Sequence, residues 1–250
     1  MKNLFFILVL ISISGCDNDF TPDCFQASGD IIQQEIKFSS FNKIIVFDRV
    51  QLIISQGDTQ KVVLETGENL YNEIKIRVED NILKIKDRNA CNLVRNFGVT
   101  KVYVTSPDII EIRNSSGSTV ESRGVLAFED LNLVSDDQLL EDEFHVDGDF
   151  KLDSLDVGII RINSNGLSTF YLKGKARQAF FRLNDSDTRI EAGELEVQFV
   201  NLFHRSTNKM IVNPQQSIKG KIVSLGNVIA KNRPPIVEVE ELYTGKLIFE

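Results

Sequence analysis

This chain of 250 residues contains no tryptophan, only two histidines and only three cysteines, and these shortages narrow its chemistry. Histidine is the usual base for an activated nucleophile. His145 and His204 are far apart, and neither has a second histidine at metal-ligand spacing. The sequence also lacks a phosphate-binding glycine loop and a nucleophile elbow. We therefore predict a protein that is not an enzyme and that uses no cofactor and no metal.

Positive charge is scarce as well. Lysine and arginine total 28 against 36 acidic residues, which gives a net charge of −8, and no basic run interrupts the chain. Phosphate backbones are bound by clustered Lys and Arg side chains. The composition therefore excludes nucleic acid as the expected partner.

Long apolar runs are missing too, and the one near the amino terminus is short. Lys2 precedes the apolar stretch 4–13, and Ser14 and Gly15 then stand directly before Cys16. A bilayer-spanning helix needs about 20 apolar residues, so this stretch is typical of a signal peptide rather than of an anchor. Residues 13–16 match a bacterial lipobox, which predicts a signal peptide over 1–15 and a lipid on Cys16. The alternative is an ordinary secretory signal in which Cys16 is incidental.

Residues 16–30 form an acidic segment that begins Cys-Asp-Asn-Asp. We interpret it as a tether between the lipid and the domain. Stable anchoring needs more than one acyl chain, and the diacylglyceryl group of bacterial lipoproteins, usually joined by a further acyl chain such as palmitate, meets this need. The acidic stretch resembles the surface-export signals of Bacteroidetes-type lipoproteins, which indicates an outer membrane lipoprotein on the periplasmic or cell-surface face. In enteric-type bacteria, Asp17 would indicate inner-membrane retention instead.

Two cysteines remain after Cys16. In an oxidising envelope, Cys24 and Cys91 are predicted to form one disulfide. Such a bridge would stabilise the fold by roughly 4 kcal/mol in the chain-entropy model. The alternative is a pair of buried free thiols.

The rest of the chain, 31–250, is predicted to be a single all-β domain. In 31–110, alternating apolar and polar residues predict strands at 41–47, 50–55, 61–66, 74–78, 82–86 and 101–105. Turn-forming residues separate them at 56–58 and 79–81. Only 68–74 has the composition of a helical turn.

Beyond Pro107 the strands become shorter and end in corners that contain Ser or Asn. The corner serines are Ser116, Ser135, Ser164, Ser186, Ser206 and Ser224, at intervals of 19, 29, 22, 20 and 18. A period of about 20 residues predicts solenoid coils over 111–230, each made of two short strands and two tight corners. The predicted fold is a right-handed β-helix with two packed sheets and about 20 residues per coil. Residues predicted to point inward are Ile160, Ile162, Phe181, Leu183, Ile222 and Leu225. A β-sandwich is the competing architecture.

The last segment, 231–250, begins with the sequence Lys-Asn-Arg-Pro-Pro. Proline cannot donate to a strand ladder, so Pro234 and Pro235 predict a loop. Strands at 236–241 and 242–249 are then expected to pair as a hairpin that caps the last coil.

The longest of the serine intervals, between Ser135 and Ser164, contains an acidic insertion, 136–149. Its carboxylates are Asp136, Asp137, Glu141, Asp142, Glu143, Asp147 and Asp149. Clustered carboxylates suit Ca²⁺, but the spacing matches neither an EF-hand nor a calcium-binding β-roll. We favour a solvated acidic loop.

Carbohydrate chemistry is the strongest competing interpretation. Polysaccharide lyases on related solenoids use acidic and basic residues on one face, for which Asp153, Asp156 and Arg161 are candidates, although alternation scatters them over both faces. Sugar-binding platforms are often aromatic, and the chain offers only Tyr71, Tyr103, Tyr171 and Tyr243. Its 17 phenylalanines are expected to stack in the interior.

Several motifs resemble the putative auto-transporter adhesin, head GIN domain family of Bacteroidetes-type envelope lipoproteins. They are Phe-Asn-Lys-Ile-Ile-Val at 41–46, Val-Gln-Leu-Ile-Ile-Ser-Gln-Gly-Asp at 50–58, Val-Glu-Asp-Asn-Ile-Leu-Lys-Ile at 78–85 and Val-Tyr-Val-Thr-Ser-Pro at 102–107. The match is strongest over 41–118. The later corners, such as Asn-Ser-Asn-Gly at 163–166, depart from the family's Ser-Gly repeats.

The resemblance implies a β-helix related to pectin-lyase-like solenoids and a role in adhesion. We therefore predict a non-enzymatic binding or adhesion module of the bacterial envelope. The lipid attaches it to the membrane, and its expected partner is a cell-surface protein or glycan. The alternatives are a polysaccharide-binding or pectin-lyase-like protein, and a structural or sensing lipoprotein with no external ligand.

Overall fold

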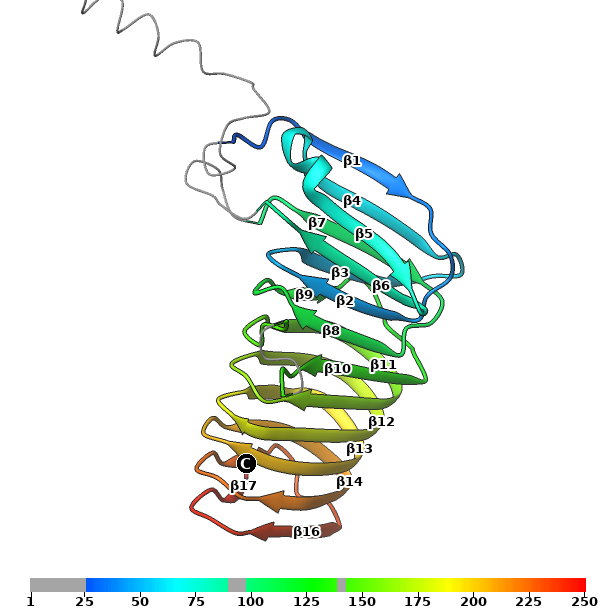
Figure 1. Ribbon diagram of the computed structural model, residues 1–250. Coiled ribbons are helices and arrows are strands. Elements are labelled where there is room, and N and C mark those ends of the chain that lie inside the picture. Colours follow the sequence, from blue (N-terminus) through cyan, green and yellow to red (C-terminus); the bar gives the residue numbers. More distant parts are fainter. Residues whose placement is uncertain (1–25, 90–97, 139–142) are drawn as a thin grey trace, which may run out of the picture.

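The computed structural model describes residues 26–89, 98–138 and 143–250, and these form an all-β fold with almost no helix (Figure 1). The strands are β1 (Ile31–Ile36), β2 (Lys43–Phe47), β3 (Gln51–Gln56), β4 (Lys61–Gly67), β5 (Ile74–Glu79), β6 (Ile82–Asp87), β7 (Lys101–Ser106), β8 (Glu111–Ser115), β9 (Val120–Ser122), β10 (Asp130–Ser135), β11 (Phe150–Ser164), β12 (Thr169–Ser186), β13 (Arg189–Ser206), β14 (Met210–Ile222), β15 (Val228–Ala230), β16 (Ile236–Glu241) and β17 (Leu247–Phe249). One 3₁₀ helix, η2, spans Glu68–Glu73.

The six strands predicted over 31–110 are confirmed, because each overlaps one of β2 to β7. The predicted helical turn at 68–74 is η2. The turn at 79–81 joins β5 and β6 as an antiparallel hairpin. Its two central residues, Asp80 and Asn81, have φ of 51° and 63°, which is the left-handed geometry that two-residue hairpin turns require.

All strands belong to one mixed sheet that curls strongly into a half-barrel with two facing layers (Figure 1). One layer contains β5, β6, β2, β8, β10 and β16, and the other contains β4, β7, β3, β9, β15 and β17. The long strands β11 to β14 take part in both layers. Their second halves continue the layer of β10 and β16, while their first halves continue the layer of β9 and β15.

The long strands pair in parallel, and their first halves pair at a constant offset. Phe150 pairs with Phe170, Phe170 with Ile190 and Ile190 with Met210, so the position number rises by the same amount from each strand to the next. The chain thus returns to the same place in the fold at regular intervals, and equivalent side chains lie above one another.

The expected division into two short strands and two tight corners is wrong for this part of the chain. Strands β12 and β13 each run for 18 residues and bend within the strand, where the pairing register shifts. The bend in β12 lies at Gly174, which has φ of 117°. A β-bulge and a glycine turn a strand without ending it, so only one side of the half-barrel is made of loops.

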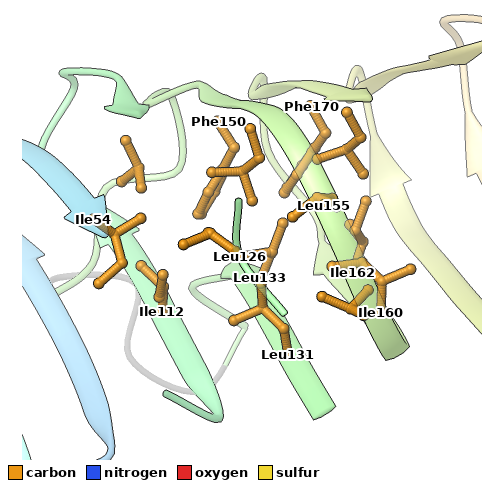
Figure 2. Close-up of a cluster of buried hydrophobic side chains, with 14 of the residues drawn as sticks. Ile54, Ile112, Leu126, Leu131, Leu133, Phe150, Leu155, Ile160, Ile162 and Phe170 are labelled. Carbon is orange, nitrogen blue, oxygen red and sulfur yellow. The ribbon is translucent and has the colours of Figure 1, made fainter. Parts of the chain in front are cut away.

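The core lies between the two layers. Phe150 and Phe170 stack with ring centroids 4.8 Å apart, and Ile54, Ile112 and Leu133 belong to the same buried cluster (Figure 2). Of the six residues predicted to point inward, Ile160, Ile162, Phe181, Leu183 and Ile222 are buried. The prediction for Leu225 is wrong, because its side chain is 56% exposed in the loop after β14.

Serines close the strands on the loop side. Ser135, Ser164, Ser186 and Ser206 are the last residues of β10 to β13 and are buried. The hydroxyls of Ser135 and Ser168 are 2.6 Å apart, and that of Ser206 donates to the carbonyl oxygen of Thr188 at 2.7 Å. Ser135, Ser164 and Ser206 therefore have hydrogen-bond partners where the chain turns, whereas the buried hydroxyl of Ser186 has none among the described residues.

The predicted capping hairpin is also wrong. β16 pairs in parallel with β14, and β17 pairs in parallel with β15, so these two strands form one further layered turn rather than a hairpin. Alternation identifies a strand but does not specify its partner. Among the described residues, no helix is long and apolar enough to cross a bilayer.

Candidate functional site

A groove of about 600 Å³ runs along the loop side of the half-barrel, and we call it the corner groove. It crosses the ends of several successive turns of the chain. Its lining consists of Val146, Asn165, Gly166, Leu167, Asp185, Ser186, Asp187, Arg205, Thr207, Val223, Ser224 and Tyr243. The strands β8, β10 and β16 point toward this side in Figure 1, and most of the lining residues belong to the ends of β11 to β14 and β16 or to the turns that follow them.

The floor of the groove is held by backbone hydrogen bonds from one turn to the next. The amide of Asp187 donates to the carbonyl oxygen of Gly166 at 3.0 Å, and that of Thr207 donates to Ser186 at 3.0 Å. Gly166 itself packs against Val146, because an added Cβ would lie 2.2 Å from the Val146 carbonyl oxygen. Such a floor is rigid and formed before any ligand arrives.

Charged side chains on the wall of the groove are paired across neighbouring turns. Arg205 Nε lies 2.7 Å from Asp185 Oδ1. The Asp187 carboxylate accepts a hydrogen bond from the Thr207 hydroxyl, and Asn208 donates to the Asp187 carbonyl oxygen at 2.7 Å. These groups are oriented by the protein and remain open to solvent, which suits hydrogen bonding to a polar ligand.

Two exposed apolar side chains complete the groove. Leu167 is 63% exposed and Tyr243 is 59% exposed, and they come from the turn after β11 and the turn after β16. An aromatic ring beside oriented polar groups provides both apolar contact and hydrogen bonding. The corner groove can therefore bind an elongated ligand that has polar and apolar faces.

His204 lies in the core and not at a polar corner. Its ring is fully buried in β13 directly behind the groove, between Leu183 and Ile222 of the adjacent strands. Burial lowers its pKa from 6.5 to about 4, although backbone contacts with Asn208 and Gly226 act in the opposite direction. His145 lies elsewhere, with an exposed side chain whose Nε2 is 3.8 Å from Asp48 Oδ1.

The described carboxylates of the acidic insertion are partly used by the protein itself. Asp136 accepts from the amide of Gln138 at 2.9 Å, Asp137 from the side chain of Asn165 at 2.7 Å, and Asp149 from the amide of Thr169 at 2.7 Å. Within 26–89, 98–138 and 143–250, no group of three or more His, Cys, Asp or Glu residues is placed to hold a metal. Glu141 and Asp142 lie outside these residues.

The three residues considered for lyase chemistry all lie on β11. Asp153 lies within the register shift between Leu152 and Leu155, Asp156 lies directly after it, and both are exposed. Arg161 lies further along the strand and pairs with Asp130. The bulge interrupts the alternation, so the predicted scatter over both faces is wrong, but Arg161 is already engaged by a carboxylate of the previous turn.

Cys16, Cys24 and Cys91 lie outside the described residues. Lipidation of Cys16 and the Cys24–Cys91 bridge therefore stay predictions. The phenylalanine prediction is confirmed only in part. Phe150 and Phe170 stack in the core, whereas Phe199 is exposed on the outside of the sheet.

The strongly curled, mixed sheet places the chain in the all-β class. Residues 40–234 match the family described as putative auto-transporter adhesin, head GIN domain, and the chain belongs to this family. No curated protein matches the sequence.

Solved structures share the fold. A putative adhesin from Bacteroides fragilis has a TM-score of 0.78 at 21% identity, and the match covers 90% of this chain and 100% of that one. A putative lipid binding protein from Parabacteroides distasonis has a TM-score of 0.63 at 15% identity, covering 89% and 97%. A putative adhesin from Parabacteroides merdae has a TM-score of 0.56 at 18% identity, covering 88% and 97%. At these identities the similarity extends to the fold alone.

Proposed function

We propose that this protein is a non-enzymatic binding and adhesion module of the bacterial envelope, anchored by a lipid on Cys16, and that the corner groove is its contact site. The observation that carries the proposal is the groove itself, which places Tyr243, Arg205 and Asp185 on a floor held by hydrogen bonds between turns. The names of the family and of its structural neighbours, putative adhesins, agree with such a role at the cell envelope.

The groove is better suited to binding than to catalysis. Asp185 pairs with Arg205, and Asp187 accepts a hydrogen bond from Thr207. Both carboxylates are therefore held in fixed orientations by side chains of the neighbouring turn. They remain good hydrogen-bond acceptors for a ligand hydroxyl or amide.

We also propose that the parallel part of the fold is a right-handed β-helix with about 20 residues per coil. The constant step between the paired positions 150, 170, 190 and 210 and the parallel pairing of β11 to β14 support it. Parallel strands connected within one sheet are joined with right-handed connections in about 98% of cases. In such a β-helix, the corner groove would run straight along the helix axis.

The lipid anchor predicts a simple change of location. Replacing Cys16 by serine removes the thiol that carries the lipid, so the protein is expected to move from the outer membrane fraction to the released fraction. Fractionation with immunoblotting measures this, and Cys24→Ser serves as the control because it leaves the lipobox intact. Continued membrane association of Cys16→Ser would contradict the anchor.

The face of the membrane can be tested on intact cells. A surface adhesin is degraded by protease added outside the cell, whereas a periplasmic protein is protected. Protection of the wild-type protein in cells with an intact outer membrane would overturn display at the surface and favour a structural or sensing role inside the envelope.

The groove predicts a specific loss of binding. Tyr243→Ala is expected to weaken binding of the full-length protein to its ligand on a glycan array or on host-cell surfaces about fivefold, because aromatic contacts of this kind contribute about 1 kcal/mol. Leu242→Ala is the matched control, because Leu242 is 58% exposed next to Tyr243 but does not line the groove.

Equal effects of the two substitutions would contradict a binding role for the groove. Cleavage of a bound polysaccharide by the wild-type protein, and its dependence on calcium, would overturn the non-enzymatic assignment and would return attention to the acidic insertion at 136–149.

A further inference from the structure

The outside of one sheet layer carries aromatic and basic side chains in register. We define the outer sheet face by six residues on β11 to β14, which are Arg161, Phe180, Arg182, Phe203, Lys219 and Lys221. In Figure 1 these strand segments belong to the layer that contains β8, β10 and β16. The face lies beside the corner groove but shares no lining residue with it.

Strand alternation fixes the outward direction of these side chains. On β12, Ala179, Phe181 and Leu183 are buried, so Phe180 and Arg182 between them point to the other side of the sheet. The same alternation on β13 buries Leu202 and directs Phe203 outward.

The register places each ring next to a cation. Arg161 pairs with Phe180, Arg182 with Phe203 and Phe203 with Lys221. The Arg161 guanidinium lies 5.4 Å from the centroid of Phe180, and the Arg182 guanidinium lies 5.6 Å from that of Phe203. Neighbouring strands are about 4.8 Å apart, so Arg182, Phe203 and Lys221 form one short row of cation, ring and cation across three strands. In the adjacent row, Asn201 lies between Phe180 and Lys219.

The face has four cations, and three of them pair with carboxylates, Arg161 with Asp130 and the two lysines with glutamates, so it keeps an excess of one positive charge on a protein whose net charge is −8. Lys219 Nζ lies 2.9 Å from Glu238 Oε2, and Lys221 Nζ lies 3.4 Å from Glu240 Oε2. Such exposed pairs contribute little, so a ligand carboxylate can replace the glutamates at low cost. Within the part of the chain that the structure describes, Arg182 has no carboxylate partner, and its guanidinium can hold a carboxylate through two parallel hydrogen bonds.

We propose that the outer sheet face binds an acidic polysaccharide whose sugar rings carry carboxylates. Arg182 and the two lysines bind successive carboxylates, and the ring of Phe203 contacts the C–H face of a sugar. This inference rests on the proposed binding role of the protein but not on the corner groove.

A polymer of this kind fits the face better than a membrane does. Phe180 and Phe203 are only partly exposed and lie beside guanidinium groups, so they do not protrude far enough to enter a lipid layer. The row of Arg182, Phe203 and Lys221, with about 4.8 Å from each strand to the next, instead suits a ligand with a short repeat.

Calorimetric titration of the full-length protein with oligogalacturonate tests the proposal, and its methyl ester is the matched neutral probe. We expect binding of the acid and at least a tenfold loss for Arg182→Gln. Arg123→Gln is the control, because Arg123 also lies over an aromatic ring, 5.3 Å from the centroid of Tyr103 in the other layer, and its loss should leave the affinity within twofold. Lys221→Gln is a second variant, expected to weaken binding, should Arg182→Gln fail to fold.

Several results would overturn the proposal: no binding of the acid, equal binding of the ester, or equal losses for Arg182→Gln and Arg123→Gln. Binding only to vesicles of phosphatidylglycerol and phosphatidylcholine would reject it in favour of a lipid surface. Tyr243→Ala separates the two sites, because it should leave oligogalacturonate binding unchanged whether or not the groove is functional.

Discussion

Replacing Gly174 by alanine is expected to lower the free energy of unfolding by roughly 3 kcal/mol or more. Gly174 has φ of 117°, which a residue with a side chain rarely adopts. An added Cβ would lie 2.2 Å from the carbonyl oxygen of Leu155 on the neighbouring strand. That backbone cannot retreat easily, because Leu155 forms a parallel bridge with Leu126 on its other side.

Urea unfolding followed by circular dichroism measures this effect, and Gly124→Ala is its matched control. Gly124 also has positive φ, 76°, but nothing lies within 4 Å of the place that an added Cβ would take. It should therefore cost only the conformational strain, about 1 kcal/mol. Similar losses for both variants would mean that the bend at Gly174 is not tightly packed against β11.

Bends inside the long strands, such as the one at Gly174, could not be predicted from the sequence. Alternation of apolar and polar residues predicted the strands of 31–110, and short polar motifs predicted the serines that end β10 to β13. A β-bulge, however, shifts the alternation by one residue in the same way as a short turn does. The interior bends of β12 and β13 were therefore mistaken for corners that separate short strands.

The pairing partners of the last two strands could not be predicted from the sequence either. The residues of β16 and β17 have clear strand patterns, but these do not tell whether the strands pair with each other or with β14 and β15. Exposure at a turn is also not encoded by residue type, which explains why Leu225 was placed in the core.

The spacing of three residues that line the corner groove gives a weak signal for it in the sequence. Asn165, Asp185 and Arg205 follow one another at the same step as the paired positions 170, 190 and 210, so they lie on consecutive turns. The uneven serine intervals, which fall from 22 to 20 and then 18, blurred this register. A constant step taken from the long strands would have aligned the polar residues into one strip.

His204 predicts a loss of stability in acid. Its pKa is about 4 in the folded protein and near 6.5 in the unfolded chain, because burial among apolar side chains disfavours the charged ring. In the described residues, neither ring nitrogen has a partner with full hydrogen-bond geometry. Below pH 6.5 the unfolded state binds a proton that the folded state does not bind, so the free energy of unfolding falls as the pH falls. The loss attributable to His204 reaches roughly 3 kcal/mol near pH 4 and then levels off.

Urea unfolding at pH 7, 5.5 and 4.5 measures this loss, and His204→Leu should remove the part of it that His204 causes. Leucine suits the site because the paired positions on either side are Leu183 and Ile222. His145→Gln is the control: it removes an exposed histidine, and the loss caused by His204 should remain. It also leaves a single histidine, whose ring resonances report the pKa of His204 directly by NMR. A titration midpoint near 6.5 in that variant would show that the ring is hydrated and that acid acts on the fold through other groups.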